Sequence, residues 1–431
     1  MIEMARPRRR KKRGRLRGLF RLMLFAAAGF ALAGGIGAGI LALVGMPTYE
    51  APSVDFELET SPEHVARGKR LVSMLCNRCH FDGKTDTLSG RALDDITSKL
   101  GDLRAPNITR DPDHGIGSWT PGELALLLRT GLHPKTNLLV MPPVMPRWPK
   151  LADDDLMAIV AFLHSDDPWV APTQTEPEAT DYSLFATLRS WVTWSPLPYP
   201  RTEVNAPSRD GLEQYGAYLV DDVFHCAQCH TDDWAGQTGP ELRSLSSYME
   251  GDVIFLDVNE VILRSANLTP HATGIDGWTG EDMHQVLVEG FGPDGKVVRW
   301  PMPRYPGLTR ADSEAIFAHL QTVTPVENEW DPSPPYRIIG RKAAPGRHLY
   351  MTNGCHYCHG DREKGHEGLA DLRGIPEERA TVEACTEFVK NPRKADPFHP
   401  MPAWEGVLAE DEYADLCSYV LSLGKRPKLG K

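Results

Sequence analysis

The stretch "NGCHYCHG" (residues 353–360) places two cysteines and two histidines within five positions. Similar clusters occur twice more, as "LCNRCHF" (75–81) and "HCAQCHT" (225–231), and all three share the pattern CxxCH. Two cysteines separated by two residues can bind zinc, form a redox disulfide, or attach a haem covalently when a histidine follows directly. Which of these groups the motif binds decides both the fold and the function.

The residues around the motifs favour covalent haem. Zinc would need two more ligands at a second fixed spacing, and no repeat offers a matching CxxC or HxxxH partner. A redox cysteine pair has no use for a histidine that always follows it. Two thiols that bond the two vinyl groups of one porphyrin, in contrast, bring the next histidine beneath the iron as its proximal ligand. The predicted residues of three haem c groups are Cys76, Cys79 and His80, Cys226, Cys229 and His230, and Cys355, Cys358 and His359.

Each CxxCH is followed, after a variable loop, by Met-Pro with an aromatic residue close behind. The three loops read "MPRWPKL" (145–151), "MPRYPGL" (302–308) and "MPAWEGV" (401–407). A methionine thioether opposite histidine keeps the iron six-coordinate and raises its potential, as an electron carrier requires. Because three methionines occupy one aligned position, the predicted distal iron ligands are Met145, Met302 and Met401. Met141 is a rival in the first repeat, and His399 is a rival in the third.

The motifs lie inside longer repeats. A helical pattern containing glycine precedes each CxxCH, and an amphipathic helix led by acidic residues follows each Met-Pro. Alternation of the strand type is scarce, so the predicted fold is mainly α. We predict three tandem domains, at 62–168, 209–325 and 341–425, called the first, second and third repeat below. Pro-rich linkers are predicted at 169–208 and 326–340.

The first two repeats share further signals. "PNITRDPDHGIGSWTPGE" (106–123) matches "ANLTPHATGIDGWTGED" (266–282). Thr120 with Glu123, and Thr279 with Asp282, have the spacing of capping boxes at a helix start. Gly131 and Gly290 suit the ends of those helices. Asn107 and Asn267 match glycosylation sequons, but their recurrence at one place favours a structural loop.

The N-terminus differs from the rest of the chain. Residues 1–21 hold ten of the 47 Lys/Arg and one of the 58 Asp/Glu, which leaves 37 against 57 in the remainder. The acidic remainder excludes nucleic acid as the main partner, since phosphates require a basic folded surface. Residues 22–46 carry no charge and would span about 37 Å as a helix, enough to cross a bilayer core. We predict a cytoplasmic basic segment at 1–21 and a transmembrane anchor at 22–46, with a cleaved signal peptide as the alternative.

The repeats resemble class I cytochrome c domains, with a glycine-containing first helix that crosses a last helix, CxxCH between them, and a methionine-bearing loop. Residues 62–425 as a whole resemble the triheme cytochrome c subunits of membrane-bound bacterial dehydrogenases, such as the alcohol and gluconate dehydrogenases. The resemblance is most specific at "PNITRDPDHGIGSWT", at its echo in 267–279, and at "MPRW" and "MPRY". It implies a dehydrogenase subunit that delivers electrons, and ubiquinone or an onward carrier that accepts them. The third repeat has a short loop before its Met-Pro, closer to single-haem cytochromes.

The predicted function is electron transfer, without a substrate of its own, by haems in the periplasm beside the bacterial inner membrane. Methionine-ligated iron has no open site, so the alternative, a peroxidase- or oxidase-like haem enzyme, would require one distal methionine to be absent or displaceable. The predicted partners are a dehydrogenase subunit and quinone, an oxidase or a soluble cytochrome, and the acidic surface suits a basic redox protein.

Four further residues and one apolar segment complete the predictions. His225 and His356 are predicted to be surface residues. Cys385 and Cys417 either form a disulfide or are buried thiols. The apolar segment "LFATLRSWVTW" (184–194) either rests on the membrane surface or packs between domains.

Overall fold

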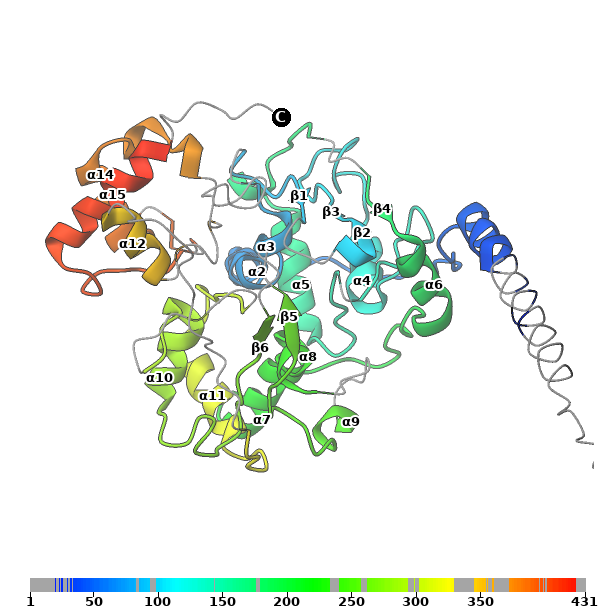
Figure 1. Ribbon diagram of the computed structural model, residues 1–431. Coiled ribbons are helices and arrows are strands. Elements are labelled where there is room, and N and C mark those ends of the chain that lie inside the picture. The colour runs from blue at the N-terminus through cyan, green and yellow to red at the C-terminus, as the bar shows by residue number, and fades with distance from the viewer. Residues whose placement is uncertain are drawn as a thin grey trace, which may run out of the picture.

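The structure is a computed structural model (Figure 1). It describes residues 34–82, 85–93, 98–142, 144–175, 179–232, 240–256, 262–293, 298, 302–328, 345–353, 355, 359, 372–394, 396–397, 399 and 401–423, with single positions 20, 23, 25, 29 and 32. The α-helices are α2 (Pro62–Leu75), α3 (Asn77–His80), α4 (Pro121–Thr130), α5 (Asp153–Leu163), α6 (Leu184–Thr193), α7 (Leu212–Tyr218), α8 (Ala227–His230), α9 (Pro240–Arg243), α10 (Gly280–His284), α11 (Arg310–Leu320), α12 (Pro345–Thr352), α14 (Val382–Lys390) and α15 (Glu410–Leu423). Residues 34–44 are also helical.

Shorter elements connect these helices. The 3-10 helices are η1 (Ser98–Leu100), η2 (Pro168–Val170), η5 (Leu372–Gly374) and η6 (Glu377–Arg379), and the π-helices are η3 (Leu219–Val223) and η4 (Gln285–Glu289). The strands are β1 (Arg91–Ala92), β2 (Gly101–Asp102), β3 (Arg104–Ala105), β4 (Asp181–Tyr182), β5 (Ile254–Leu256) and β6 (Ile262–Arg264). They form the antiparallel pairs β1–β3, β2–β4 and β5–β6, the last with Phe255 opposite Leu263. The mainly α prediction is confirmed.

In each repeat the first helix crosses the last helix at a glycine. Gly68 of α2, Gly216 of α7 and Gly346 of α12 lie against α5, α11 and α15. A Cβ atom at these glycines would lie 1.9, 1.8 and 2.1 Å from a carbonyl oxygen of the closing helix. Only glycine allows two helix backbones to approach this closely. The glycine in each helical pattern therefore fixes the crossing.

The second repeat has two more residues between its glycine and its first cysteine than the first repeat. The spacing is eight residues in the first repeat, ten in the second and nine in the third. In all three, the cysteine amide donates to the carbonyl of the buried residue four positions after the glycine. These bonds join Cys76 to Val72 (2.9 Å), Cys226 to Val220 (2.8 Å) and Cys355 to Tyr350 (3.1 Å). The π-helix η3 accommodates the extra residues of the second repeat, so the cysteine stays in place.

The capping signals of the first two repeats are confirmed. Thr120 and Glu123 form a capping box at α4, and Thr279 and Asp282 form one at α10. Gly131 ends the first of these helical segments and Gly290 the second, with φ of 78° and 79°. Both values lie in the left-handed region that favours glycine.

The segment 169–208, expected to be an irregular linker, packs on the first repeat. Strand β4 pairs with β2, and α6 contributes Ala186 to a hydrophobic cluster with Leu103 and Met141. The 326–340 linker lies outside the described residues, apart from 326–328.

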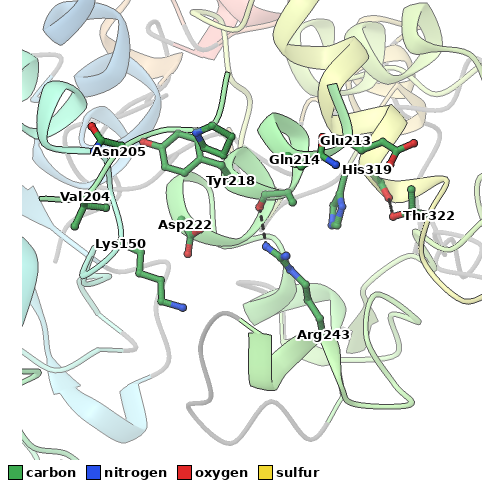
Figure 2. Close-up of a pocket in the computed structure, with 12 residues that line it drawn as sticks. Lys150, Val204, Asn205, Glu213, Gln214, Tyr218, Asp222, Arg243, His319 and Thr322 are labelled. Atoms are coloured by element: carbon green, nitrogen blue, oxygen red, sulfur yellow. Dashed lines mark hydrogen bonds between the residues drawn. The ribbon is translucent and has the colours of Figure 1, made fainter. Parts of the chain in front are cut away.

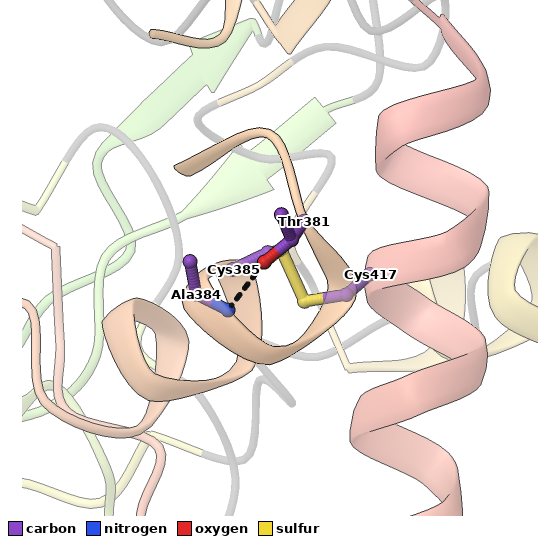
Figure 3. Close-up of a disulfide and its surroundings, with 4 residues drawn as sticks. All are labelled: Thr381, Ala384, Cys385 and Cys417. Carbon is purple, nitrogen blue, oxygen red and sulfur yellow. Dashed lines mark hydrogen bonds between the residues drawn. A yellow bond between two sulfur atoms is a disulfide. The ribbon is translucent and has the colours of Figure 1, made fainter. Parts of the chain in front are cut away.

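The first two repeats share one continuous hydrophobic core, which includes Leu71, Phe162, Val220 and Ile316. The third repeat has its own cluster around Tyr350, and a cluster around Tyr413 that it shares with Phe291 of the second repeat. Cys385 of α14 and Cys417 of α15 form a disulfide with a Cα–Cα distance of 5.9 Å (Figure 3). Of the two states predicted for this pair, a disulfide or two buried thiols, the structure shows the disulfide.

Part of the predicted anchor at 22–46 lies outside the described residues. In the part of the chain that the structure does describe, no helix has both the length and the apolar character needed to span a membrane. The helical residues 34–44 lie to one side of the body, and α6 is the element next to them (Figure 1).

Candidate haem-attachment sites

The described residues of the three CxxCH motifs share one backbone hydrogen bond. The N–H groups of His80, His230 and His359 donate to the carbonyls of Cys76, Cys226 and Cys355, at 2.9, 3.0 and 3.0 Å. The amides of Cys79 and Cys229 donate to the same cysteine carbonyls, both at 3.1 Å. Cys358 and His356 lie outside the described residues. One helical turn therefore carries the first cysteine and the histidine in each repeat.

His80 and His230 are oriented for a ligand at Nε2. Both are buried, and their Nδ1 atoms lie 2.8 Å from the carbonyl oxygens of Pro106 and Ala266. Because a carbonyl only accepts, Nδ1 carries the proton and Nε2 keeps its lone pair. Burial lowers the pKa of both histidines, against the opposing effect of these hydrogen bonds. The neutral form, which is the form that binds iron, is therefore favoured.

An asparagine turn follows each of these carbonyls. Asn107 Oδ1 accepts from the Thr109 N–H (2.9 Å) and hydroxyl (2.7 Å), and Asn267 accepts from Thr269 at the same distances. Both asparagines are buried, and each Nδ2 donates to a distant backbone carbonyl. The structural-loop interpretation of the two sequons is confirmed. Sequence reasoning missed that this loop also supports the proximal histidine; the repeated "NIT" and "NLT" was the signal that could have shown it.

The cysteine environments fit thioether formation better than zinc or redox chemistry. Burial raises the pKa of the Cys76 and Cys226 thiols to about 12, and neither forms a disulfide. Zinc sites and redox pairs depend on thiolates, which this environment disfavours. Among the described residues, no group of three or more His, Cys, Asp or Glu side chains could hold a metal ion. A pair of thiols followed by one oriented imidazole suits covalent haem.

The three aligned methionines have related surroundings. Met145 and Met302 are partly buried against the cluster that also contacts Cys76 and Cys226, and Met401 packs on a cluster with Cys355. Met141 is fully buried in a different cluster, with Leu93 and Leu103. The cluster around Met141 also contacts Cys79, so both methionines lie near the first CxxCH, and the distal-ligand assignment stays a prediction.

In the first two repeats, an arginine after Met-Pro holds the loop against the glycine that ends the preceding helical segment. Arg147 and Arg304 pass across Gly131 and Gly290, where a Cβ atom would lie 2.7 Å from Arg147 Cδ and 1.8 Å from Arg304 Nε. The guanidinium of Arg147 donates to the Ser195 carbonyl at 2.8 Å, and that of Arg304 to Val298 at 2.6 Å. The "MPR" motif and the left-handed glycine therefore form one structural unit, which occurs in the first and the second repeat.

The methionine loop of the first repeat contacts the cysteine motif of the second. Trp148 stacks on His225 with ring centroids 5.8 Å apart, and its Nε1 donates to the Val223 carbonyl at 3.0 Å. His225, predicted to be a surface residue, is half-buried under this contact, and burial lowers its pKa to about 4. Sequence inspection could not find the contact, since the two residues lie in different repeats.

Tyr305 lies on the methionine loop of the second repeat, and the same loop contacts the first repeat at Gly307, where a Cβ atom would lie 2.8 Å from Arg70 Cγ. The buried ring of Tyr305 lies 4.6 Å from the ring of Phe224. Burial raises the Tyr305 pKa well above its usual value; the Cys226 and Cys229 thiols add to the shift and Arg78 opposes it. Since Arg78 belongs to the first CxxCH and these thiols to the second, the two motifs approach one another at the interface.

Two equivalent aspartates bind residues across the interface between the first and second repeats. Asp155, at the start of α5, accepts from the Tyr218 hydroxyl of the second repeat at 2.6 Å. Asp312, at the start of α11, accepts from Tyr215 at 3.3 Å and pairs with Arg70 of the first repeat at 3.7 Å. Each aspartate is almost fully buried. Such pairs fix one arrangement of the two repeats, because a buried carboxylate that loses its partners is costly.

A cavity of about 570 Å³ lies at the edge of the same interface (Figure 2). Lys150 of the first repeat and Tyr218, Asp222, Arg243 and His319 of the second are among its lining residues. Burial raises the pKa of Asp222 to about 6. His319 continues into a buried network: its Nε2 lies 3.2 Å from the Tyr248 hydroxyl, which donates to Asp221 at 2.8 Å.

The third repeat contacts the second through its own methionine loop. Arg393 pairs with Glu289 at 2.7 Å and donates to the Val288 carbonyl at 2.7 Å. Trp404 lies edge-on to Phe291 with centroids 5.2 Å apart. His399 Nδ1 accepts from the Met401 N–H at 3.1 Å, so the two rival distal ligands are neighbours.

Comparison with known proteins supports the resemblance. The family model "Cytochrome C oxidase, cbb3-type, subunit III" matches residues 341–420. The alcohol dehydrogenase (quinone) cytochrome c subunit of Gluconacetobacter polyoxogenes is 26% identical over 78% of this chain and 70% of its own length. The fructose dehydrogenase cytochrome subunit of Gluconobacter japonicus is 26% identical over 66% and 57%, and a diheme cytochrome c-type protein of Cereibacter sphaeroides is 28% identical over 61% and 86%.

These similarities confirm the predicted resemblance to cytochrome c subunits of bacterial dehydrogenases, at modest identity over most of the chain. Such subunits transfer electrons and are not themselves the catalytic enzyme, in agreement with the expected electron-transfer role. The cytochrome c relationship also supports haem c as the cofactor.

Proposed function

We propose that this chain is a membrane-anchored, periplasmic triheme cytochrome c that relays electrons from a dehydrogenase subunit to quinone or another acceptor. The observation that carries the proposal is the repeated histidine geometry. His80 and His230 follow the same turn and donate from Nδ1 to an equivalent carbonyl at 2.8 Å. The third repeat adds the same turn at His359.

The chain's own residues would hold each haem c from both sides. The paired thiols attach the porphyrin, the buried histidine presents Nε2, and the methionine loop, held by Arg147 or Arg304, presents a thioether. Haem iron supplies one-electron exchange when bound. The protein contributes burial and fixed ligand positions, both of which limit reorganisation when the charge changes.

The first two sites would exchange electrons through the interface. Trp148 connects the first methionine loop to the residue before Cys226, and Tyr305 lies near Arg78 of the first motif. The second and third repeats meet through Trp404 and Phe291. A chain of three neighbouring sites suits relay between a donor and an acceptor at different surfaces.

Export and anchoring are supported by two features, and the charge of the remaining chain bears on the partner. The uncharged stretch 22–46 follows a basic segment, which is typical of a helix that keeps its N-terminus in the cytoplasm. The Cys385–Cys417 disulfide suits an oxidising compartment. The acidic remainder favours a basic redox partner, so association with it should weaken as salt increases.

Intact mass tests the haem count. The polypeptide from a strain competent for cytochrome maturation should exceed its amino-acid mass by three haem groups. Replacing Cys226 and Cys229 with serine should remove one of them, and a matched Cys385→Ser variant should retain all three. A mass equal to the bare polypeptide would refute the proposal. Two haems in the unmodified protein would leave a diheme carrier.

A further inference from the structure

Helix α6 exposes its large apolar side chains and buries its small ones. Phe185, Leu188 and Val192 are 51%, 51% and 73% exposed. The side chains turned toward the first repeat are Ala186, Thr187 and Ser190, all buried. A surface helix of a soluble protein has the opposite arrangement, with its large apolar residues inward. The outer face of α6 (Leu184, Phe185, Leu188, Trp191 and Val192) is therefore an apolar surface that no other described part of the chain covers.

This face adjoins the exposed apolar helix at the N-terminus. Trp191 Nε1 donates to the carbonyl of Gly45 at 2.9 Å, and the Tyr49 hydroxyl donates to the carbonyl of Trp194 at 3.3 Å. The helical residues 34–44 end at this contact, and Ile36, Ile40, Leu43 and Val44 are 56–88% exposed. In Figure 1 the two elements lie together on the same side of the molecule. The two apolar surfaces thus meet at one junction.

The charge and aromatic residues of α6 fit a lipid headgroup region. The helix contains no acid and one base, Arg189, although the chain after residue 21 is strongly acidic. The Arg189 guanidinium lies 6.0 Å from the Phe185 ring and 5.3 Å from the Trp194 ring. Tryptophan and tyrosine concentrate at membrane–water boundaries, and helices with one apolar face lie in that plane. Trp191, Trp194 and Tyr49 supply such a group of aromatic residues.

We infer that the outer face of α6 lies in the headgroup–acyl boundary of the lipid bilayer that residues 22–46 enter, as a second and independent membrane contact. The inference deepens the proposed anchoring and rests on it. It has a consequence for orientation. The inner face of α6 packs on a cluster that also contacts Met46 and Cys79, so the first CxxCH is the membrane-proximal motif. The third repeat, at the opposite side in Figure 1, points away from the bilayer.

Lipid photolabelling of the full-length holoprotein tests the inference. The protein is reconstituted into vesicles of phosphatidylcholine and phosphatidylglycerol that carry a diazirine on the acyl chain. After illumination, mass spectrometry locates the labelled peptides. We expect label in 22–46 and in 184–194. The variant Phe185→Gln/Leu188→Gln/Val192→Gln should lose most label at 184–194 and keep it at 22–46.

A matched control uses exposed apolar residues elsewhere. Leu212 and Val407 are 41% and 44% exposed but lie away from α6. The variant Leu212→Gln/Val407→Gln should leave the labelling pattern of the unmodified protein unchanged. Haem absorbance verifies that each variant is folded. The pattern of the unmodified protein alone is decisive if the triple variant fails to fold.

The outcomes separate this inference from the proposed anchor. Label in 22–46 alone would overturn the α6 contact, and a protein partner would then be the occupant of that face. Label in 184–194 alone would support the contact and overturn the anchor. Label in neither segment would overturn both.

Discussion

Where the closing helix passes the glycine of the first helix, the first repeat has Phe162 and the second has His319. Phe162 is fully buried and lies edge-on to Trp169 at 6.3 Å. His319 is also buried, but its Nε2 lies 3.2 Å from the Tyr248 hydroxyl, which donates to Asp221. Asp221 in turn binds Arg243. The same backbone crossing therefore has an apolar centre in one repeat and a polar network in the other.

This difference shows which features the shared fold requires. Both repeats need the glycine, the carbonyl that accepts from the proximal histidine, and the arginine across the left-handed glycine. The polarity beside each CxxCH is free to vary, provided that every buried polar group has a partner. The stability of the second repeat can thus depend on pH through His319, whereas the first repeat has Phe162 at the equivalent position.

The largest expected effect comes from removing the shared crossing. Gly216→Ala places a Cβ atom 1.8 Å from a backbone oxygen of α11, and Gly68→Ala places one 1.9 Å from α5. Backbone cannot move aside as a flexible side chain can, so each should lower the free energy of unfolding by about 3 kcal/mol or more. Guanidinium unfolding measures the loss. Gly374→Ala, where a Cβ atom would meet nothing within 4 Å, is the control and should change little.

The asparagine turn should matter equally in both repeats. Asn107→Ala or Asn267→Ala leaves a buried threonine N–H and hydroxyl without their acceptor, at a cost of about 2 kcal/mol. The carbonyl that orients His80 or His230 should also loosen, which shifts the absorbance of the affected haem. Asn205→Ala, at an exposed position, is the matched control. Equal behaviour of all three variants would contradict the supporting role of the turn.

Acid should destabilise the second repeat through His319. Burial lowers its pKa to about 4, whereas the unfolded residue titrates near 6.5, so the unfolded state binds the proton more readily below pH 6.5. Stability from this group is present above that pH and falls by about 2 kcal/mol between pH 7 and pH 5. His319→Phe, which copies the first repeat, should remove this part of the pH dependence. The test is unfolding of both proteins at the two pH values.

The reverse substitution in the first repeat provides a second test of the role of His319. Phe162→His should introduce acid sensitivity in the first repeat, because that site has no equivalent of the Tyr248–Asp221 pair among its described contacts. If His319→Phe keeps the full pH dependence of the unmodified protein, the acid response arises elsewhere.

The smallest expected effect concerns the contact between the repeats. Trp148→Phe removes the Nε1 hydrogen bond to the Val223 carbonyl but keeps an aromatic ring against His225. The free energy of unfolding should fall by about 1 kcal/mol. Trp191→Phe, which removes a hydrogen bond at an exposed site, should cost less. The comparison fails if the exposed substitution is the costlier one.

Local patterns were sufficient to predict much of the site. CxxCH, Met-Pro, the capping boxes at Thr120 and Thr279 and the terminal glycines involve residues a few positions apart, and backbone geometry fixes their arrangement. The mainly α fold and the glycine in each first helix are also local signals. The sequence therefore indicated the candidate residues of each site and, by repetition, that the candidate sites are alike.

Contacts between distant residues could not be predicted in this way. The stacking of Trp148 on His225, the disulfide of Cys385 with Cys417 and the outward face of α6 depend on where separate segments meet. A period of 3.6 residues shows that a helix has two faces, but only packing decides which one faces the protein. The sequence by itself determined the chemistry of each motif, because that chemistry is set by neighbours along the chain. The tertiary structure alone decided which motifs approach one another and which apolar surface stays uncovered, because those depend on burial between segments far apart in sequence.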